Sequence, residues 1–188
     1  MKQPSLQTAR LILRSFSLQD VDALVRLVGD RQVAATTLRI PHPYAEKDAH
    51  DFIASCQPEF EQGLGARFAI TISDSNELCG GTGLHVSRLH NHAELGYWIG
   101  VPYWGRGYAT EATAAVVRYG FDTLSLRRIH ASVFAGNIAS ARVLLKVGMQ
   151  LEGRLRDHIC KWEKFYDLEY YGMLQTDWMR SEARRLVR

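Results

Sequence analysis

The chain has 188 residues, of which 46% are hydrophobic and 23% are charged, and its formal net charge is +3. This composition excludes an intrinsically disordered chain and favours one soluble domain with a sizeable core. The last nine residues, 180–188, hold four Arg and one Glu, so the excess charge lies in this segment alone. A balanced remainder argues against a broadly basic face, and we expect no direct nucleic-acid partner.

The N-terminus has no apolar signal region, and no apolar run approaches membrane-spanning length. Cys56, Cys79 and Cys160 are odd in number, far apart and form no CxxC pair. This argues against a disulfide framework and against a thiolate metal site. We therefore expect a cytoplasmic protein with no membrane partner and no metal.

The first predicted elements are a strand and two helices. Residues 10–16 alternate in polarity as a strand does. Ser17 is a good N-cap for a helix over about 18–28, which Gly29 ends. A second helix begins at Glu46, and Pro58 is expected to bend or end it.

The rest of the chain alternates between strands and helices. The predicted elements are strands at 67–72, 78–86 and 93–101, a helix over about 107–123, a strand at 129–134, a helix over 138–147, and strands near 150–158 and 165–174. The order β-α-α-β-β-β-α-β-α-β-β predicts an α/β fold with one mixed sheet. We place the domain over residues 1–179 and treat residues 180–188 as a basic C-terminal tail, with a helical or frayed extension beginning near 177.

The most informative segment is a glycine-bearing loop, Trp-Gly-Arg-Gly-Tyr-Ala at 104–109, which joins a strand to a helix. Glycines let successive backbone N–H groups turn inward together, and the helix N-terminus adds its dipole, so the loop suits a phosphate or pyrophosphate. It is not a Walker A loop, because no Gly-Lys-Ser/Thr follows, and it is not G-x-G-x-x-G, because Thr110 stands at the third glycine position. Taken alone, the loop is equally compatible with a turn that needs glycine for steric reasons.

The next strand and helix strengthen the ligand interpretation. Asn137 is a credible N-cap and Gly148 a credible C-terminal glycine of the helix between them. Asn137, Ser140 and Leu144 share one face of that helix. Both helices begin after strands that we expect to be neighbours, at the strand ends where open α/β sheets bind ligands.

With these motifs the sequence resembles the GNAT superfamily of acetyl-CoA-dependent N-acetyltransferases, and within it the ribosomal-protein N-terminal acetyltransferases of the RimJ/RimL type. The loop at 104–109 matches the family's acetyl-CoA loop, with Trp104 in its first position. Asn137, Ser140, Lys146 and Gly148 match a second family motif, with Met149 in place of Phe. The segments 8–14 and 40–44 and the pair Tyr166-Asp167 also fit, and the resemblance covers about residues 5–175.

The resemblance implies the GNAT fold, a mostly antiparallel sheet flanked by helices, and direct transfer of acetyl from acetyl-CoA to an amine in a ternary complex. It implies that the loop N–H groups hold the pyrophosphate and that the preceding strand offers partners for the pantetheine and the thioester carbonyl. The implied cofactor-binding residues are Ile99, Gly100, Val101, Trp104, Gly105, Arg106, Gly107, Tyr108, Ala109, Thr110, Asn137 and Ser140.

Two residues are the catalytic candidates. Glu94 is the leading general base or water-positioning group, and its alternative is a solvated strand carboxylate. Relatives carry another candidate carboxylate near Asp157 and His158, but the matching position is Ile159. Many family members protonate the thiolate with a Tyr where this chain has Leu144, so we assign that role to Ser140, whose alternative is a hydroxyl bonded to its own helix.

The acceptor remains open at this stage. A protein N-terminal α-amine, of the ribosomal-protein type, needs the least help, since its pKa is roughly 7.7–8.0 against about 10.4 for Lys. A small amine such as a polyamine, an amino acid or an antibiotic would undergo the same reaction. A non-catalytic acyl-CoA sensor is the alternative of a different class. The Arg tail could dock on RNA, and a homodimer is compatible with the resemblance.

Overall fold

The structure is a computed structural model that describes residues 2–186, with side chains described for residues 2–181. Its strands are β1 (Leu6–Gln7), β2 (Leu11–Arg14), β3 (Gly65–Ile72), β4 (Leu78–Ser87), β5 (His92–Ile99), β6 (Arg128–Phe134), β7 (Gln150–Lys161) and β8 (Lys164–Leu174). Its α-helices are α1 (Val21–Val28), α2 (Arg31–Ala35), α3 (Glu46–Glu61), α4 (Tyr108–Arg118), α5 (Ile138–Lys146) and α6 (Gln175–Leu186).

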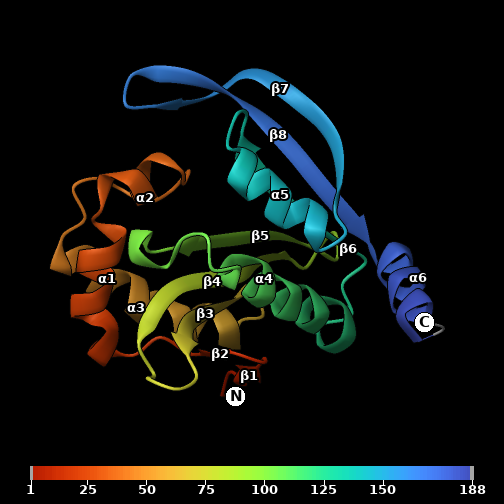
Figure 1. Ribbon diagram of the computed structural model, residues 1–188, viewed down its shortest axis with the longest axis horizontal. Coiled ribbons are helices and arrows are strands. Elements are labelled where there is room, and N and C mark those ends of the chain that lie inside the picture. The colour runs from red at the N-terminus through yellow and green to blue at the C-terminus, as the bar shows by residue number, and fades with distance from the viewer. Residues whose placement is uncertain (1, 187–188) are drawn as a thin grey trace.

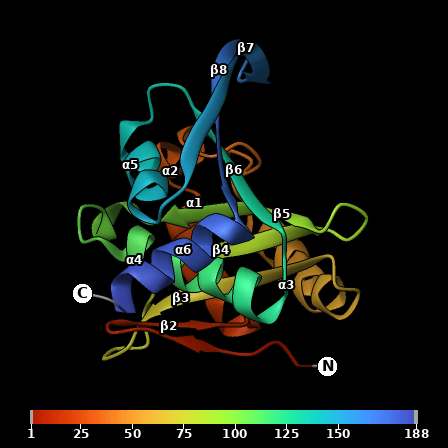
Figure 2. The same ribbon diagram turned by 90° about the vertical axis from the view of Figure 1, so that its right-hand side faces the viewer.

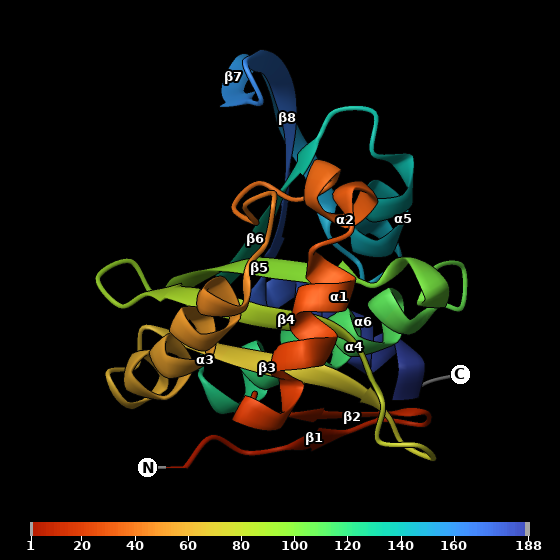
Figure 3. The same cartoon turned by 90° about the vertical axis from the view of Figure 1, so that its left-hand side faces the viewer.

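The strands form one sheet in the order β1-β2-β3-β4-β5-β6-β8-β7. Every neighbouring pair is antiparallel except β5 and β6, which are parallel. Helices α1 and α3 cover one face of the sheet and α4 the other (Figures 1 and 3). The predicted mixed sheet flanked by helices is therefore confirmed, and so is the predicted order of its main elements.

The core lies between the sheet and these helices. Leu11 and Leu13 of β2, Phe68 and Ile70 of β3, and Val116 of α4 have no solvent-exposed surface. Alternate residues of β2 are buried, as the predicted period of two requires. Burial of these side chains fixes which face of each strand meets the helices, and it thereby fixes the register of the strands that carry the site.

Strands β5 and β6 are paired over a very short length. Only His92, Ala93 and Glu94 of β5 pair with β6, opposite Arg128, Ile129 and His130. Beyond this point β6 rises away from β5 and continues beside β8 (Figures 2 and 3). The edge of β5 that faces β6 is therefore unpaired from residue 95 onward, directly before the glycine-bearing loop. We call this parting of the strands the β5–β6 fork.

The structure corrects three details of the sequence-based prediction. The second helix does not end at Pro58 but continues to Glu61, because Gln62 N–H bonds to the Pro58 carbonyl (3.1 Å) and closes one more turn. The strand predicted to reach Val101 ends at Ile99, because the chain turns into a short 3-10 helix at Val101–Tyr103, where Tyr103 N–H bonds to the Gly100 carbonyl (2.9 Å).

Helix α2 is the third difference, since its five residues are too few to show a period. Asp30 caps it by accepting a hydrogen bond from Gln32 N–H (2.8 Å). In addition, α6 begins at Gln175 and continues to Leu186, so the proposed boundary at residue 180 falls inside a helix. The side chains of residues 182–188, which include three of the four tail Arg, lie outside the described residues. No helix within the described part of the chain is both long and apolar enough to cross a membrane.

A buried ion pair fixes the start of α1, which borders the candidate site described below. Asp20 is 4% exposed and accepts two hydrogen bonds from the Arg14 guanidinium (2.7 and 2.8 Å) and one from Ser17 N–H (2.8 Å). Burial by itself would raise the pKa of Asp20, but the hydrogen bonds from Arg14 and Ser17 outweigh it and hold the pKa below its usual value.

We predict that Asp20→Asn lowers the free energy of unfolding at pH 7 by about 2 kcal/mol, because it leaves the Arg14 guanidinium without its anionic partner. The pKa of Asp20 is lower in the folded state than in the unfolded state. The stabilisation by Asp20 is therefore fully present above its unfolded-state pKa of about 3.9 and is lost as the pH falls through its folded-state pKa. Urea unfolding at pH 7 and at acid pH measures it. The exposed Asp22→Asn is the control, and equal stabilities of the two variants at pH 7 would contradict the assignment.

Candidate functional site

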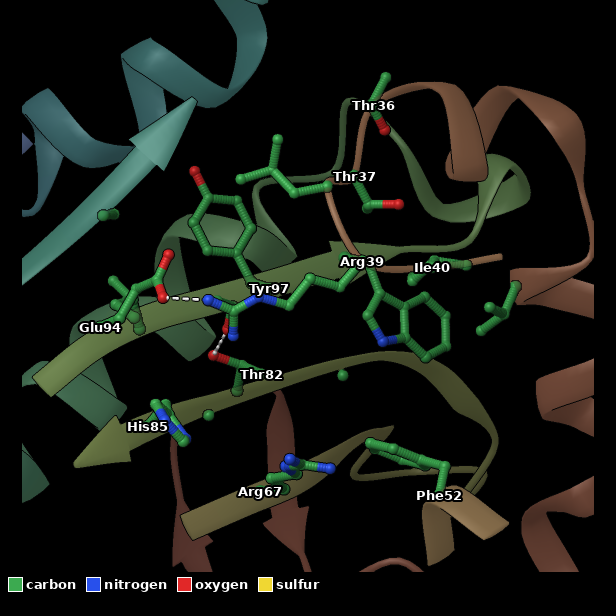
Figure 4. A pocket seen from close by; sticks show the side chains of 18 of the residues that line it. Thr36, Thr37, Arg39, Ile40, Phe52, Arg67, Thr82, His85, Glu94 and Tyr97 are labelled. Carbon is green, nitrogen blue, oxygen red and sulfur yellow. Dashed lines mark hydrogen bonds and ion pairs between the residues drawn. The ribbon is translucent and has the colours of Figure 1, made fainter. Parts of the chain in front are cut away.

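A cavity of about 520 Å³ lies over β4 and β5, between the α1–α3 region and β6 with α5. Tyr97 and Ser140 line it at the β5–β6 fork, and Phe16, Phe52 and Trp98 line its aromatic end. Figure 4 shows Arg39 extending along the cavity to Glu94, with Phe52 on the opposite side. We call this space the central cavity.

Glu94 stands at the β5–β6 fork, because it belongs to the last residue pair that joins the two strands. Its Oε1 accepts a hydrogen bond from Ser132 Oγ across the fork (3.0 Å). Its Oε2 pairs with the Arg39 guanidinium at 2.5 Å. The Glu94 side chain is 23% exposed, whereas that of Arg39 is 72% exposed. The carboxylate is thus held from the sheet side by Ser132 and from the solvent side by a cation on a loop.

Ser140 is held at the fork by its helix cap and by a tyrosine. Asn137 Oδ1 accepts the hydrogen bond of Ser140 N–H (3.1 Å), as expected for an N-cap. The Tyr97 hydroxyl lies 2.7 Å from Ser140 Oγ and 3.0 Å from the Ser140 carbonyl oxygen. Burial raises the pKa of Tyr97 to about 12, although the Ser140 hydrogen bond opposes the rise, so Tyr97 is a neutral phenol at pH 7. Two hydroxyl groups therefore lie together where the sequence indicated one.

The glycine-bearing loop has the backbone geometry that its sequence predicts. Gly105 and Gly107 have φ values of +74° and +81°, where a β-carbon is strained. A β-carbon at Gly105 would meet nothing within 4 Å, so the glycine is required by conformation rather than by packing. Trp104 closes the loop, since its indole N–H donates to the Ile99 carbonyl (2.6 Å).

The loop also presents free donors. Within the described residues, the backbone N–H groups of residues 105–110 have no hydrogen-bond acceptor, and the ladder of α4 begins only with Glu111 N–H to the Gly107 carbonyl (3.1 Å). Successive free N–H groups at a helix N-terminus form a site for an anion. The residues therefore fit a diphosphate group.

Other predicted cofactor contacts are already engaged within the chain. Gly100 N–H bonds to the Cys79 carbonyl, and the Ile99 carbonyl accepts from Trp104. The Gly100 and Val101 carbonyls accept from Tyr103 N–H (2.9 Å) and Trp104 N–H (3.2 Å). The unpaired groups lie instead on the edge of β5 nearer to Glu94, at the β5–β6 fork.

The two halves of the predicted site are adjacent but distinct. Glu94 and Ser140 both line the central cavity, whereas none of residues 99–110 does. A ligand that uses both parts must be elongated, with an anionic portion on the loop and its reactive end in the cavity.

One of the two late-strand candidates, His158, also lies near Glu94. A smaller cavity of about 250 Å³ is lined by Glu94, Ser132, His158 and Ile159, together with His130. Asp157 does not line it, and its N–H donates to Asp167 Oδ1 (2.8 Å). No cluster of three or more His, Cys, Asp or Glu side chains among the described residues could hold a metal ion.

Sequence reasoning did not identify the roles of Arg39, Ser132 and Tyr97. Arg39 lies 55 residues from Glu94 in the chain, and Ser132 lies 38 residues from it. Ser132 could have been found from the parallel register of two strands, because it follows the partner of Glu94 by two residues and so has the same orientation. Nothing in the local pattern around Arg39 indicates its contact with Glu94.

An elongated ligand with an anionic portion fits this arrangement, and comparison with known proteins gives the family of the chain. Residues 10–150 match the family model described as an acetyltransferase (GNAT) domain. The chain is 35% identical over 173 residues to the uncharacterized N-acetyltransferase YoaA of Bacillus subtilis, covering 92% of this chain and 97% of that one. The chain therefore belongs to the GNAT acetyltransferases and is an acetyl-CoA-dependent N-acetyltransferase.

Two further comparisons agree with this assignment. The crystal structure of a GNAT-family acetyltransferase from Bacillus anthracis aligns with a TM-score of 0.82 at 27% identity, over 92% of this chain and 99% of that one. The [ribosomal protein uS5]-alanine N-acetyltransferase of Escherichia coli is 30% identical over 120 residues, which is 63% of this chain and 62% of that one. The GNAT fold expected from the sequence is confirmed.

Proposed function

We propose that this enzyme acetylates an N-terminal α-amine of a protein, of the ribosomal-protein type. The observation that carries the proposal is the chemistry of the central cavity beyond Glu94. Its aromatic end is formed by Phe16, Phe52 and Trp98, and Leu24 and Ile40 add aliphatic surface. Walls of this kind suit the first side chain and backbone of an apolar peptide N-terminus.

The carboxylates around the cavity argue against a polycationic acceptor. Asp48 accepts from Ala45 N–H (2.7 Å) at the start of α3, Asp51 pairs with Lys47, and Glu94 pairs with Arg39. Each carboxylate that lines the cavity thus already has a partner. A polyamine would have to compete with Lys47 for Asp51 as well as with Arg39 for Glu94, whereas a single amine competes only with Arg39.

Acetylation of an α-amine requires little help from the protein in removing a proton from the amine. With a pKa of roughly 7.7–8.0, a substantial fraction of such an amine is neutral near pH 7.5. Glu94 then receives the proton that the amine loses, either directly or through a water that it positions. Ser132 orients the carboxylate, and Arg39 must move or share Glu94 when an acceptor enters.

Acetyl-CoA, when bound, supplies the acetyl group as a thioester. In the proposal the free N–H groups of residues 105–110 hold its diphosphate, and the unpaired edge of β5 receives its pantetheine arm. Ser140 donates a hydrogen bond or a proton to the departing sulfur, and Tyr97 supports the Ser140 hydroxyl. The relative that acts on ribosomal protein uS5 supports a ribosomal acceptor for this chain as well.

We predict that purified protein releases free thiol from acetyl-CoA most efficiently with short peptides that have a free α-amine and an apolar first residue. Matched peptides blocked at the N-terminus but carrying Lys, spermidine, free amino acids and aminoglycosides form the comparison panel, and product mass identifies the acetylated nitrogen. A higher kcat/KM for spermidine or for a small amine would overturn the acceptor assignment. Tight acetyl-CoA binding with no turnover on the whole panel would favour a sensor.

We predict that Glu94→Gln lowers kcat by about 10²-fold, at the lower end of general acid–base effects, because an α-amine needs only modest help. Ser140→Ala should lower kcat by about tenfold with little change in the KM for acetyl-CoA, because its N–H bond to Asn137 survives. Steady-state kinetics with the best peptide measures both. Asp74→Asn, in an exposed turn, is the control, and wild-type rates in either active-site variant would remove that residue from the mechanism.

A further inference from the structure

A conspicuous contact outside the central cavity joins the N-terminal segment to the first turn of α4. Thr8 Oγ1 donates to Glu111 Oε1 (2.7 Å), and Arg10 N–H donates to the same oxygen (2.9 Å). The Arg10 guanidinium binds the other oxygen through Nε (2.8 Å) and a terminal nitrogen (2.6 Å). Glu111 thus receives four contacts from a segment about a hundred residues earlier in the chain.

The same guanidinium also contacts the glycine-bearing loop. A terminal nitrogen of Arg10 donates to the Arg106 carbonyl (3.1 Å), and the guanidinium carbon lies 4.9 Å from the centre of the Tyr108 ring. In a trans peptide the C=O and the following N–H point in opposite directions. Because the Arg106 carbonyl is held toward Arg10, the Gly107 N–H points away from Arg10. This N–H is one of the free N–H groups of the loop.

The charge of Glu111 gives this contact a second consequence. Burial would raise the pKa of Glu111, but the hydrogen bonds from Thr8 and Arg10 lower it overall, so the side chain is an anion at pH 7. It lies in the first turn of the helix whose N-terminal N–H groups face the proposed diphosphate site. An uncompensated carboxylate there would repel the diphosphate, and Arg10 supplies the compensating charge.

We propose that Arg10 is a positioning residue for acetyl-CoA, which neutralises Glu111 and orients the Arg106–Gly107 peptide so that the loop can bind the diphosphate. The inference rests on the proposed placement of the diphosphate at residues 105–110. Arg10 does not touch the reacting atoms. The Arg10 side chain is 51% exposed, and ion pairs of such exposed groups contribute little to stability. We therefore expect Arg10 to affect the binding of acetyl-CoA more than the stability of the fold.

The test compares two acetyl donors, acetyl-CoA and acetyl-pantetheine, which lacks the diphosphate. We expect Arg10→Ala to raise the KM for acetyl-CoA about tenfold, with kcat at saturation retained and kcat/KM for acetyl-pantetheine unchanged. Arg10→Lys should fall between wild type and Arg10→Ala. Arg154→Ala is the matched control, because Arg154 is similarly exposed (57%) and also pairs with a carboxylate, Asp167 on the β8 strand.

A second variant separates the charge effect from loss of packing. In Arg10→Ala/Glu111→Gln the uncompensated carboxylate is absent, so part of the lost acetyl-CoA affinity should return even though more native contacts have been removed. A merely structural role predicts the opposite order, with the double variant worse than the single one. Thermal unfolding of each variant shows whether the protein remains folded under the assay conditions.

Three outcomes would overturn the proposal: an unchanged KM for acetyl-CoA in Arg10→Ala, an equal loss with both donors, or no recovery in the double variant. Calorimetric titration with CoA and with pantetheine gives the same comparison without an amine acceptor. If the acceptor assignment failed while Arg10→Ala still weakened CoA and spared pantetheine, the inference about Arg10 would stand.

Discussion

The fork between β5 and β6 is the constraint on which the rest of the site depends. Backbone N–H and C=O groups need hydrogen-bond partners, and two parallel strands that part after three residue pairs leave partners missing along both edges. Three side chains of the site lie at this break: Glu94 belongs to the last residue pair, Ser132 bonds to it across the fork, and Ser140 lies in the first turn of the helix that follows β6. The open edge of β5 can then pair with the amide groups of an extended ligand, as a further strand would.

In our proposal the site binds an anion through backbone N–H groups rather than through a cluster of basic side chains. Outside residues 180–188 the formal charge of the chain is zero, and the loop at 104–109 contains one charged residue, Arg106. Free N–H groups and a helix N-terminus provide directional donors that a flexible Lys or Arg would not. The pairing of Arg10 with Glu111 fits this scheme, because Arg10 offsets the negative charge of Glu111 beside the loop and fixes one of the loop's peptide planes.

Much of the architecture could be predicted because it depends on local sequence patterns. The glycines at 105 and 107, the Asn137 cap and the period-two strands each follow from the conformation of a few neighbouring residues. Helix α2 and the persistence of α3 past Pro58 could not be read in this way, since both depend on single capping or turn-closing hydrogen bonds.

Contacts between residues far apart in the chain could not be predicted from local sequence patterns. The sequence indicated that Ser140 lies on the ligand face of its helix, but the contact with Tyr97 joins residues 43 positions apart and depends on where α5 lies relative to β5. The contact between Arg39 and Glu94 likewise depends on the path of a loop with no regular pattern. These long-range contacts connect the candidate catalytic groups to their surroundings, and only the three-dimensional arrangement reveals them.

In our proposal the diphosphate of acetyl-CoA binds the free N–H groups of residues 105–110 while the acyl end enters the β5–β6 fork. Backbone amide chemical shifts, measured during titration with CoA and separately with pantetheine, distinguish the two contacts. We predict that CoA shifts the amides of residues 105–110 and of β5, whereas pantetheine shifts those of β5 and leaves the loop unchanged. Saturable CoA binding without any shift in residues 105–110 would contradict it.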